Sequence, residues 1–134
     1  MGMKTTVFLA LSLMLVGCSF YGVDQNAVAS IVYDVYTTTD RIADTREDWK
    51  LPDRTLSEGG DCEDLSILAL YRIYQQLGVK GTLVVGWIVR VDGSGWHAWI
   101  SVGGADYDPT LGRFEGTYSR VWEWDYDLVM AVAR

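Results

Sequence analysis

Residues 59–78 read GGDCEDLSILALYRIYQQLG, and this stretch decides the fold. Two glycines interrupt the chain, and apolar residues then cover more than half of a helical circumference up to Gly78. The pattern predicts a central, mostly buried helix from Cys62 to Leu77. Cys62 would stand in its first turn, where unpaired backbone N–H groups and the positive end of the helix dipole favour a thiolate.

The segments before residues 59–78 predict further helices, and the segments after them predict strands. Residues 37–58 are polar and irregular, so we expect mainly a connecting loop, with a short helical piece around Ile42 to Asp48. The other expected elements are a helix over Asp24 to Tyr36, antiparallel strands over Thr82 to Val91 and Trp96 to Val102, a short strand over Ala105 to Asp108, and a further strand over Tyr126 to Ala133. Together these elements predict one α+β domain with a small antiparallel sheet.

The only histidine, His97, follows the cysteine in the chain and precedes two aspartates. Cysteine, histidine and aspartate are the side chains of a thiol nucleophile, its base and the carboxylate that orients the base. We favour Asp108 as the orienting residue, because it ends the strand expected beside His97 and the following proline fixes the backbone. Asp106 is the competing choice, and either aspartate can simply open a turn. Strand alternation is expected to send the neighbouring tryptophans to the opposite face from His97.

The amino terminus has the pattern of an export signal. One basic residue, Lys4, precedes a run of about ten apolar residues, whereas a membrane-spanning helix needs roughly twenty. Leu15-Val16-Gly17-Cys18 resembles the lipobox of bacterial lipoproteins, which implies acylation of Cys18 and cleavage just before it. We therefore expect a signal peptide over residues 1–17, a lipidated tether over 18–23 and a domain over 24–134. An ordinary signal peptide that ends near a cysteine is the alternative.

The charge of the chain argues against some classes of partner, and its cysteine content bears on the role of Cys62. The chain carries a net charge of −7, and loss of Lys4 with the signal would make it more acidic, so nucleic acid and anionic lipid headgroups are poor partners. Lipidation would consume the sulfur of Cys18 and leave Cys62 without a disulfide partner. In an oxidising compartment, a lone thiol is expected to be either buried or used.

Three segments resemble the transglutaminase-like superfamily: Gly60-Asp61-Cys62-Glu63-Asp64, His97-Ala98-Trp99 and Asp108-Pro109-Thr110. Three upstream residues extend the likeness to bacterial transglutaminase-like cysteine proteinases: Trp49, Pro52 and Leu56. The resemblance covers roughly residues 45 to 112. It implies a papain-like fold in which the helix that bears Cys62 packs on an antiparallel sheet that bears His97 and Asp108.

The resemblance also implies an activity. Cys62 would attack a carbonyl and form a thioester acyl-enzyme, with His97 as general base and acid and Asp108 as orienter. The main hypothesis is a hydrolase, a protease or amidase, that acts on a protein or peptide in the cell envelope. Acyl transfer from glutamine to an amine on the same triad is one alternative, and a non-catalytic binding module that keeps the fold is another.

Other predictions concern the surroundings of the triad. Trp49 is a candidate oxyanion donor or a packing residue. The acidic residues Asp61, Glu63 and Asp64 could bind calcium, as similar residues do in some periplasmic relatives, but helix capping is the competing role. No cofactor is expected to be required. Two roles are open to the tryptophans and tyrosines: they line a substrate groove, or they pack in the core and at its rim.

The expected setting is the cell envelope. We expect an exported monomer that a lipid holds on a bacterial membrane, facing the periplasm, or on the cell surface. Ser19 after the anchor favours the outer membrane, since aspartate at this position often retains lipoproteins at the inner one.

Overall fold

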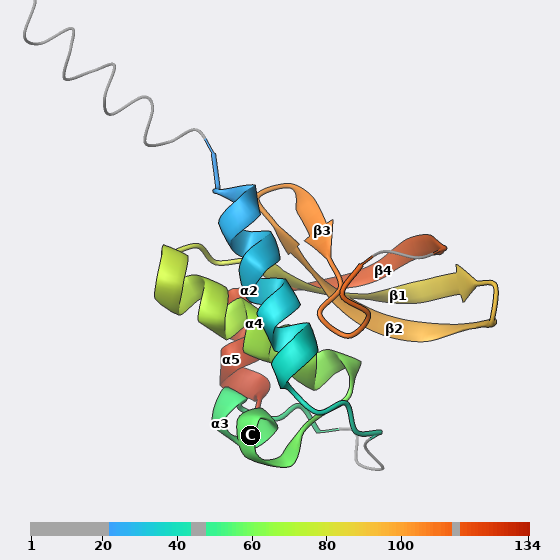
Figure 1. The fold of residues 1–134 in the computed structure, drawn as a ribbon, viewed down its shortest axis with the longest axis horizontal. Coiled ribbons are helices and arrows are strands. Elements are labelled where there is room, and N and C mark those ends of the chain that lie inside the picture. Colours follow the sequence, from blue (N-terminus) through green and yellow to red (C-terminus); the bar gives the residue numbers. More distant parts are fainter. Residues whose placement is uncertain (1–21, 44–47, 114–115) are drawn as a thin grey trace, which may run out of the picture.

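A computed structural model describes residues 22–43, 48–113 and 116–134 (Figure 1). Within these residues, four helices pack with a four-stranded antiparallel sheet, so the predicted α+β class is confirmed. In chain order the elements are α2 (Gln25–Thr38), α3 (Pro52–Glu58), α4 (Cys62–Leu77), β1 (Thr82–Arg90), β2 (Gly93–Val102), β3 (Ala105–Tyr107), β4 (Thr117–Asp125) and α5 (Tyr126–Val132).

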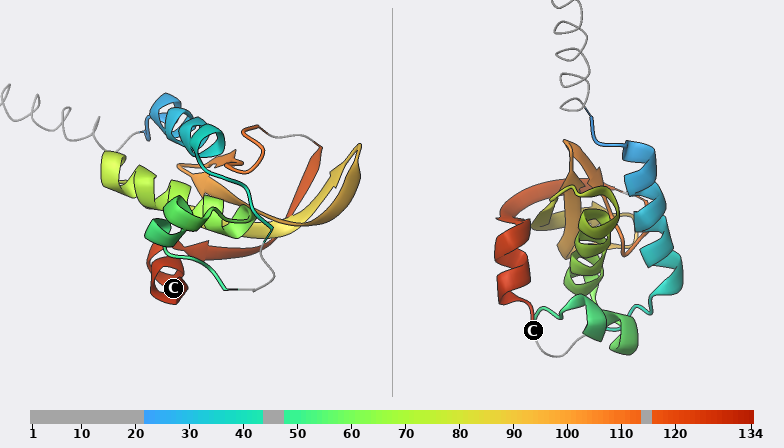
Figure 2. Two further views of the ribbon diagram at one scale, coloured as in Figure 1. Left: turned by 60° about the horizontal axis from the view of Figure 1, so that its bottom comes forward. Right: turned by 90° about the vertical axis from the view of Figure 1, so that its left-hand side faces the viewer.

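Helix α4 is central, as predicted. It lies between α2 and α5 and packs on β2 and β1 (Figure 2). Every residue from Asp64 to Leu70 is buried, because apolar side chains occupy most of its circumference. The helix begins at Cys62 and ends before Gly78, which adopts a left-handed conformation (φ 68°) that favours glycine.

The sheet has the strand order β3-β2-β1-β4, and every pairing is antiparallel. Strands β1 and β2 form a long hairpin that extends beyond the helices (Figure 1). The hairpin turns at residues 91–92, so β2 begins at Gly93, three residues earlier than predicted. Its register places His97 opposite Gly86.

The carboxyl-terminal prediction was wrong. Residues from Tyr126 form the helix α5. Its buried residues Tyr126 and Val129, and Ala133 directly after its end, follow helical spacing. The fourth strand is β4, which the sequence analysis missed. Most of β4 is exposed, so its sequence lacks the alternation of a half-buried strand.

The segment predicted to be mainly loop contains a helix, α3. Pro52 occupies its first turn, where proline is favoured because its missing N–H would have no intrahelical partner. The short helix expected around Ile42 to Asp48 falls partly on residues 44–47, which lie outside the described residues. Ile42, Ala43 and Asp48 are not helical.

Two apolar clusters lie on the two faces of the sheet. The larger joins the helices to residues such as Leu83, Ala98 and Ile100, and the smaller contains Val84, Ile88 and Trp99. Trp99 follows His97 by two residues and therefore lies on the same face of β2. The expectation that both neighbouring tryptophans face away from His97 was wrong for Trp99.

No helix in the described part of the chain is long and apolar enough to span a membrane. The predicted signal peptide, Cys18 and Ser19 lie outside the described residues.

Gly86 offers a test of this packing. A Cβ added there would lie 2.1 Å from the Ser119 carbonyl oxygen and 2.8 Å from the Trp99 ring. We expect Gly86→Ala to lower the free energy of unfolding by about 1–3 kcal/mol, because the neighbouring strand must move. Urea unfolding measures the effect. Gly95→Ala is the control, since its Cβ would meet nothing within 4 Å; equal stability of the two variants would contradict the prediction.

Candidate active site

Cys62 lies at the amino-terminal end of α4 and is half-buried. Its thiol donates a hydrogen bond to Glu63 Oε2 at 3.2 Å, and the backbone of Ala98 on β2 also hydrogen-bonds to the sulfur. Cys62 and His97 line one pocket of about 490 Å³, together with Arg41, Trp96 and Thr110 among others. The fold therefore brings the thiol and the imidazole to the same cavity.

His97 and Asp108 form a buried pair. The distance between His97 Nε2 and Asp108 Oδ2 is 2.7 Å, and the two residues are 7% and 2% exposed. A carboxylate that accepts the Nε2 proton favours the tautomer in which Nδ1 carries the lone pair. Nδ1 is then the ring nitrogen able to accept a proton from a thiol in the pocket.

Asp108 is itself held in place by three further donors. Its Oδ1 accepts hydrogen bonds from the backbone N–H groups of Thr110 (3.0 Å) and Leu111 (3.2 Å), and its Oδ2 accepts one from the Tyr118 hydroxyl (2.8 Å). The turn after the aspartate, which was the alternative role for this residue, is thus what fixes the carboxylate next to His97.

Asp106, the competing choice, has different partners. It accepts a hydrogen bond from Trp99 Nε1 at 3.2 Å and pairs with Arg120 on β4. The Trp99 ring lies nearly parallel to His97, with the ring centroids 6.3 Å apart. Asp106 therefore holds the tryptophan that packs beside the imidazole, whereas Asp108 holds the imidazole.

Tyr118 was missed by the sequence analysis. It lies on β4, packs edge-on against Trp99 at 5.1 Å and reaches Asp108 through its hydroxyl. No local motif marks it, because its contact with Asp108 depends on how β4 pairs with β1.

The electrostatics of Cys62 differ from the sequence prediction. Burial, and next the negative charge of Glu63, raise the pKa of the thiol well above its ordinary value. The hydrogen bond from the Ala98 backbone acts in the opposite direction but is the smaller effect. Burial and Glu63 therefore oppose the thiolate that the helix amino terminus was expected to favour.

Trp49 lies away from this pocket. It packs edge-on against Trp124, with ring centroids 5.3 Å apart, and is partly buried against the main core. The structure thus places it in the packing role, and it does not line the cavity of Cys62 and His97. Among the tryptophans, Trp96 does line that cavity, and its exposed ring stacks on Trp122 at the rim.

The acidic residues beside Cys62 cap the helix. Asp61 and Asp64 form a capping box, in which each carboxylate accepts the backbone N–H of the other residue. Asp64 also accepts the Lys50 backbone N–H at 2.8 Å, and Glu63 accepts the Cys62 thiol. No group of three or more potential metal-ligating side chains occurs within the described residues.

Comparisons with protein-family models, curated proteins and solved structures found no match to this chain.

The Glu63 contact predicts how the thiol reacts. Removing the charge in Glu63→Gln lowers the pKa of Cys62, so alkylation at a fixed pH near 8 should accelerate by roughly threefold or more. Mass spectrometry of the peptide that contains Cys62 follows the rate. Asp53→Asn, an exposed position on α3, is the control and should react like the wild type. An unchanged or slower rate in Glu63→Gln would contradict this account.

The buried Asp64 carboxyl predicts a pH-dependent stability. Burial raises its pKa to about 6, above the unfolded value of about 3.9, so the folded state binds the proton more tightly. The wild type should gain on the order of 1–3 kcal/mol relative to Asp64→Asn as the pH falls from 6.5 to 4. Urea unfolding across this range measures the difference. A difference that stays constant, or that shrinks toward acid pH, would be inconsistent with a raised pKa.

Proposed function

We propose that the protein is a cysteine hydrolase, a protease or amidase, with Cys62 as nucleophile, His97 as general base and acid, and Asp108 as the residue that orients the imidazole. The observation that carries the proposal is the buried His97–Asp108 pair, whose histidine lines the same cavity as Cys62. The likeness of the three sequence segments to the transglutaminase-like superfamily supports the same assignment, and a papain-like core is part of the proposal.

In the proposed reaction, the thiol starts neutral. When a substrate carbonyl enters the cavity, His97 Nδ1 accepts the Cys62 proton as the sulfur attacks the carbonyl carbon. The Cys62 backbone N–H, at the start of α4, is one donor to the resulting oxyanion. His97 then protonates the leaving amine, and a thioester forms. Water hydrolyses the thioester, with His97 again accepting and returning a proton.

The surroundings of His97 suit this cycle. The imidazole becomes positively charged when it takes the thiol proton, and the adjacent Asp108 carboxylate stabilises that charge. Tyr118 and two backbone N–H groups keep the carboxylate in one orientation. Substrate binding would also displace water from the cavity, which strengthens the interaction between the imidazolium and the carboxylate.

The proposed setting is the bacterial envelope. The lipobox-like sequence ending at Cys18 supports a lipid anchor, and Cys62 is the only cysteine of the described residues, where it forms no disulfide. The substrate would then be a protein or peptide on the same membrane face, and we propose that the protein acts as a monomer.

A second candidate is a binding module without catalysis. The observation in its favour is the hydrogen bond from the Cys62 thiol to Glu63, together with burial that raises the pKa of the thiol. Under this hypothesis the cavity recognises an envelope partner, and Cys62 forms no thioester.

The test incubates the protein with envelope proteins and searches for new termini and new isopeptide bonds by mass spectrometry. We expect new termini that are absent with Cys62→Ser. The serine hydroxyl is a weaker nucleophile than the thiol, and the position of His97 is suited to the thiol. Isopeptide bonds with ammonia release would instead indicate acyl transfer. A wild type that produces no new terminus, no isopeptide bond and no hydrolysed side-chain amide would overturn the catalytic proposal and leave the binding module.

The two aspartates provide a matched comparison in the same assay. Asp108→Asn removes the charge that stabilises the imidazolium, so we expect turnover to fall on the order of 10²–10⁴-fold. Asp106→Asn keeps His97 and Asp108 in contact and should have a far smaller effect. Equal losses in the two variants would contradict the assigned role of Asp108.

A further inference from the structure

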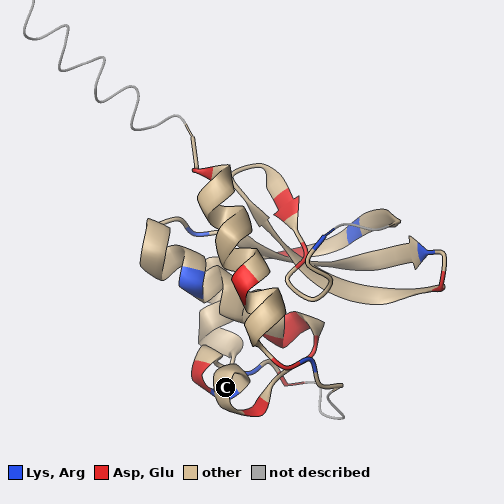
Figure 3. Ribbon diagram, in the orientation of Figure 1, with Lys and Arg blue, Asp and Glu red and all other residues tan. Residues whose placement is uncertain are grey.

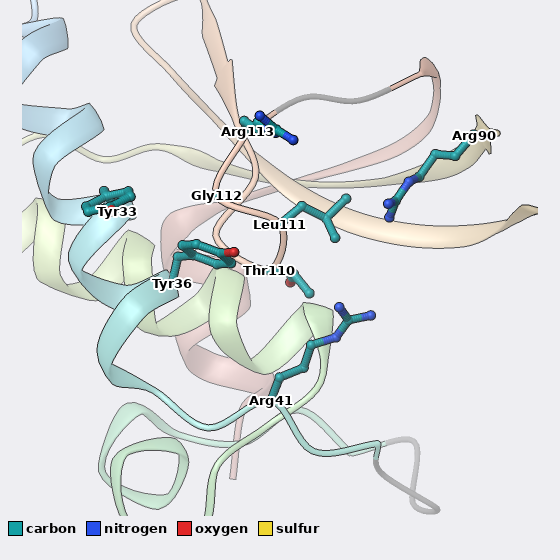
Figure 4. Close-up of a pocket in the computed structure, with 8 residues that line it drawn as sticks. All are labelled: Tyr33, Tyr36, Arg41, Arg90, Thr110, Leu111, Gly112 and Arg113. Atoms are coloured by element: carbon teal, nitrogen blue, oxygen red, sulfur yellow. The ribbon is translucent and has the colours of Figure 1, made fainter. Parts of the chain in front are cut away.

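Figure 4 shows a second cavity, of about 420 Å³. It shares Arg41 and Thr110 with the cavity of Cys62 and His97. Arginines from three separate segments line it: Arg41, Arg90 and Arg113. This clustering is unusual in a chain with 18 acidic and 11 basic residues, in which acidic positions are spread over helices and loops (Figure 3). The cavity is therefore a basic site on an acidic protein.

Arg41 connects this cavity to the proposed nucleophile. Its backbone pairs with Gly60, two residues before Cys62, through the hydrogen bonds Ile42 N–H to Gly60 O (2.8 Å) and Gly60 N–H to Asp40 O (3.1 Å). The Arg41 side chain lines both cavities and is exposed. It forms no ion pair with any carboxylate in the described part of the chain, although acidic residues are in excess.

Arg90 approaches the same space from the hairpin. It lies at the end of β1, and its guanidinium pairs with Asp92 at 3.3 Å. Figure 4 shows the guanidinium groups of Arg41 and Arg90 extending into the cavity beside Leu111. Two guanidinium groups directed at one space suit an anionic group, because planar N–H donors match the two oxygens of a carboxylate.

Thr110 supplies an independent indication of a polar ligand. It is 4% exposed and lines both cavities, yet its Oγ1 has no hydrogen-bond partner among the described residues. A buried hydroxyl without a partner is costly, so a bound polar group would satisfy it.

Two tyrosines of α2 complete the wall. Tyr33 and Tyr36 are 61% and 43% exposed, and their rings lie 6.1 Å apart. Gly112 lets the chain pass close to Tyr36, because a Cβ there would lie only 2.7 Å from the ring. The aromatic rings can contact the apolar part of a ligand whose charged end reaches the arginines.

We propose that this cavity is a substrate subsite that binds the carboxylate of an acidic residue next to the carbonyl that Cys62 attacks, with Arg41 as the residue that determines specificity. The proposal rests on the proposed function. Continuity of the two cavities through Arg41 and Thr110 places the acidic residue and the reacting carbonyl on one substrate. The net charge of −7 disfavours a polyanion, whereas a single carboxylate can enter between the arginines.

The first experiment measures cleavage selectivity. The full-length protein, purified in detergent, is incubated with a peptide library from a digested bacterial proteome, and new termini are sequenced by mass spectrometry. We expect Asp or Glu to be enriched at least about tenfold at one fixed position beside the cleaved bond. Arg41→Gln should reduce this preference about tenfold, and Arg54→Gln, on α3, should retain it. Cleavage without acidic preference, or a preference unchanged by Arg41→Gln, would overturn the subsite.

A second measurement tests binding to the subsite without turnover. It therefore distinguishes failure of the subsite proposal from failure of the proposed catalytic function. Full-length Cys62→Ser protein labelled with ¹⁵N is titrated with N-acetylglutamate α-amide, its glutamine isostere and inorganic phosphate. We expect a saturable shift of the Arg41 Nε–H resonance with the glutamate compound and at least tenfold weaker binding of the isostere. An equal response to both compounds, no response, or tighter binding of phosphate would each overturn the proposal.

Discussion

The buried carboxylate of Asp64 is the interaction on which the site depends. It caps α4 through the Asp61 backbone, and it also accepts the backbone N–H of Lys50, 14 residues earlier in the chain. The Lys50 ammonium in turn donates to the Gly59 carbonyl. These contacts fix where α4 begins, and Cys62 occupies that position. A carboxylate with a raised pKa is the cost of this arrangement, since burial disfavours its charge.

A second buried carboxylate, Asp108, fixes the position of His97, as Asp64 fixes the start of α4. Asp108 is hydrogen-bonded to His97 and Tyr118 on two strands, β2 and β4, and Asp64 accepts a hydrogen bond from Lys50, 14 residues earlier. Each aspartate has an exposed fraction of 2% or less. Cys62 and His97 come together because α4 packs on β2. The backbone of Ala98 contacts the Cys62 sulfur, and His97 directly precedes Ala98. The catalytic proposal therefore rests on helix–sheet packing as much as on the three side chains.

Burial and Glu63 raise the pKa of the Cys62 thiol, so the proposed mechanism includes a proton transfer from the sulfur to His97 as the substrate binds. Glu63 is central to this property, because it is the nearest negative charge to the sulfur and accepts its hydrogen bond. Such an arrangement limits oxidation of an unpaired thiol in an oxidising compartment, since the thiolate is the reactive form. The charge of Glu63, which lowers the reactivity of the thiol, thus suits the proposed envelope setting.

Local patterns predicted the elements whose apolar faces are repeated and well separated from turns. Helix α4, with its glycine at the end and its capping box at the start, follows directly from residues 59–78, and the β1–β2 hairpin follows from a run of β-branched residues. Helix α5 was mistaken for a strand because a seven-residue apolar segment carries little periodicity. Strand β4 was missed because it is largely exposed and gains its stability from pairing with β1.

The sequence by itself determined the helix that carries Cys62, the hairpin that carries His97 and the choice of Asp108, because spacing, glycine positions and the Asp-Pro-Thr turn are local properties. Only the tertiary structure decided the raised pKa of the Cys62 thiol, the contact of Tyr118 with Asp108 and the cavity lined by Arg41, Arg90 and Arg113. These depend on burial and on segments brought together from distant parts of the chain. Charge and hydrogen bonding at a site are set by the neighbours that folding supplies, which the linear order of residues does not contain.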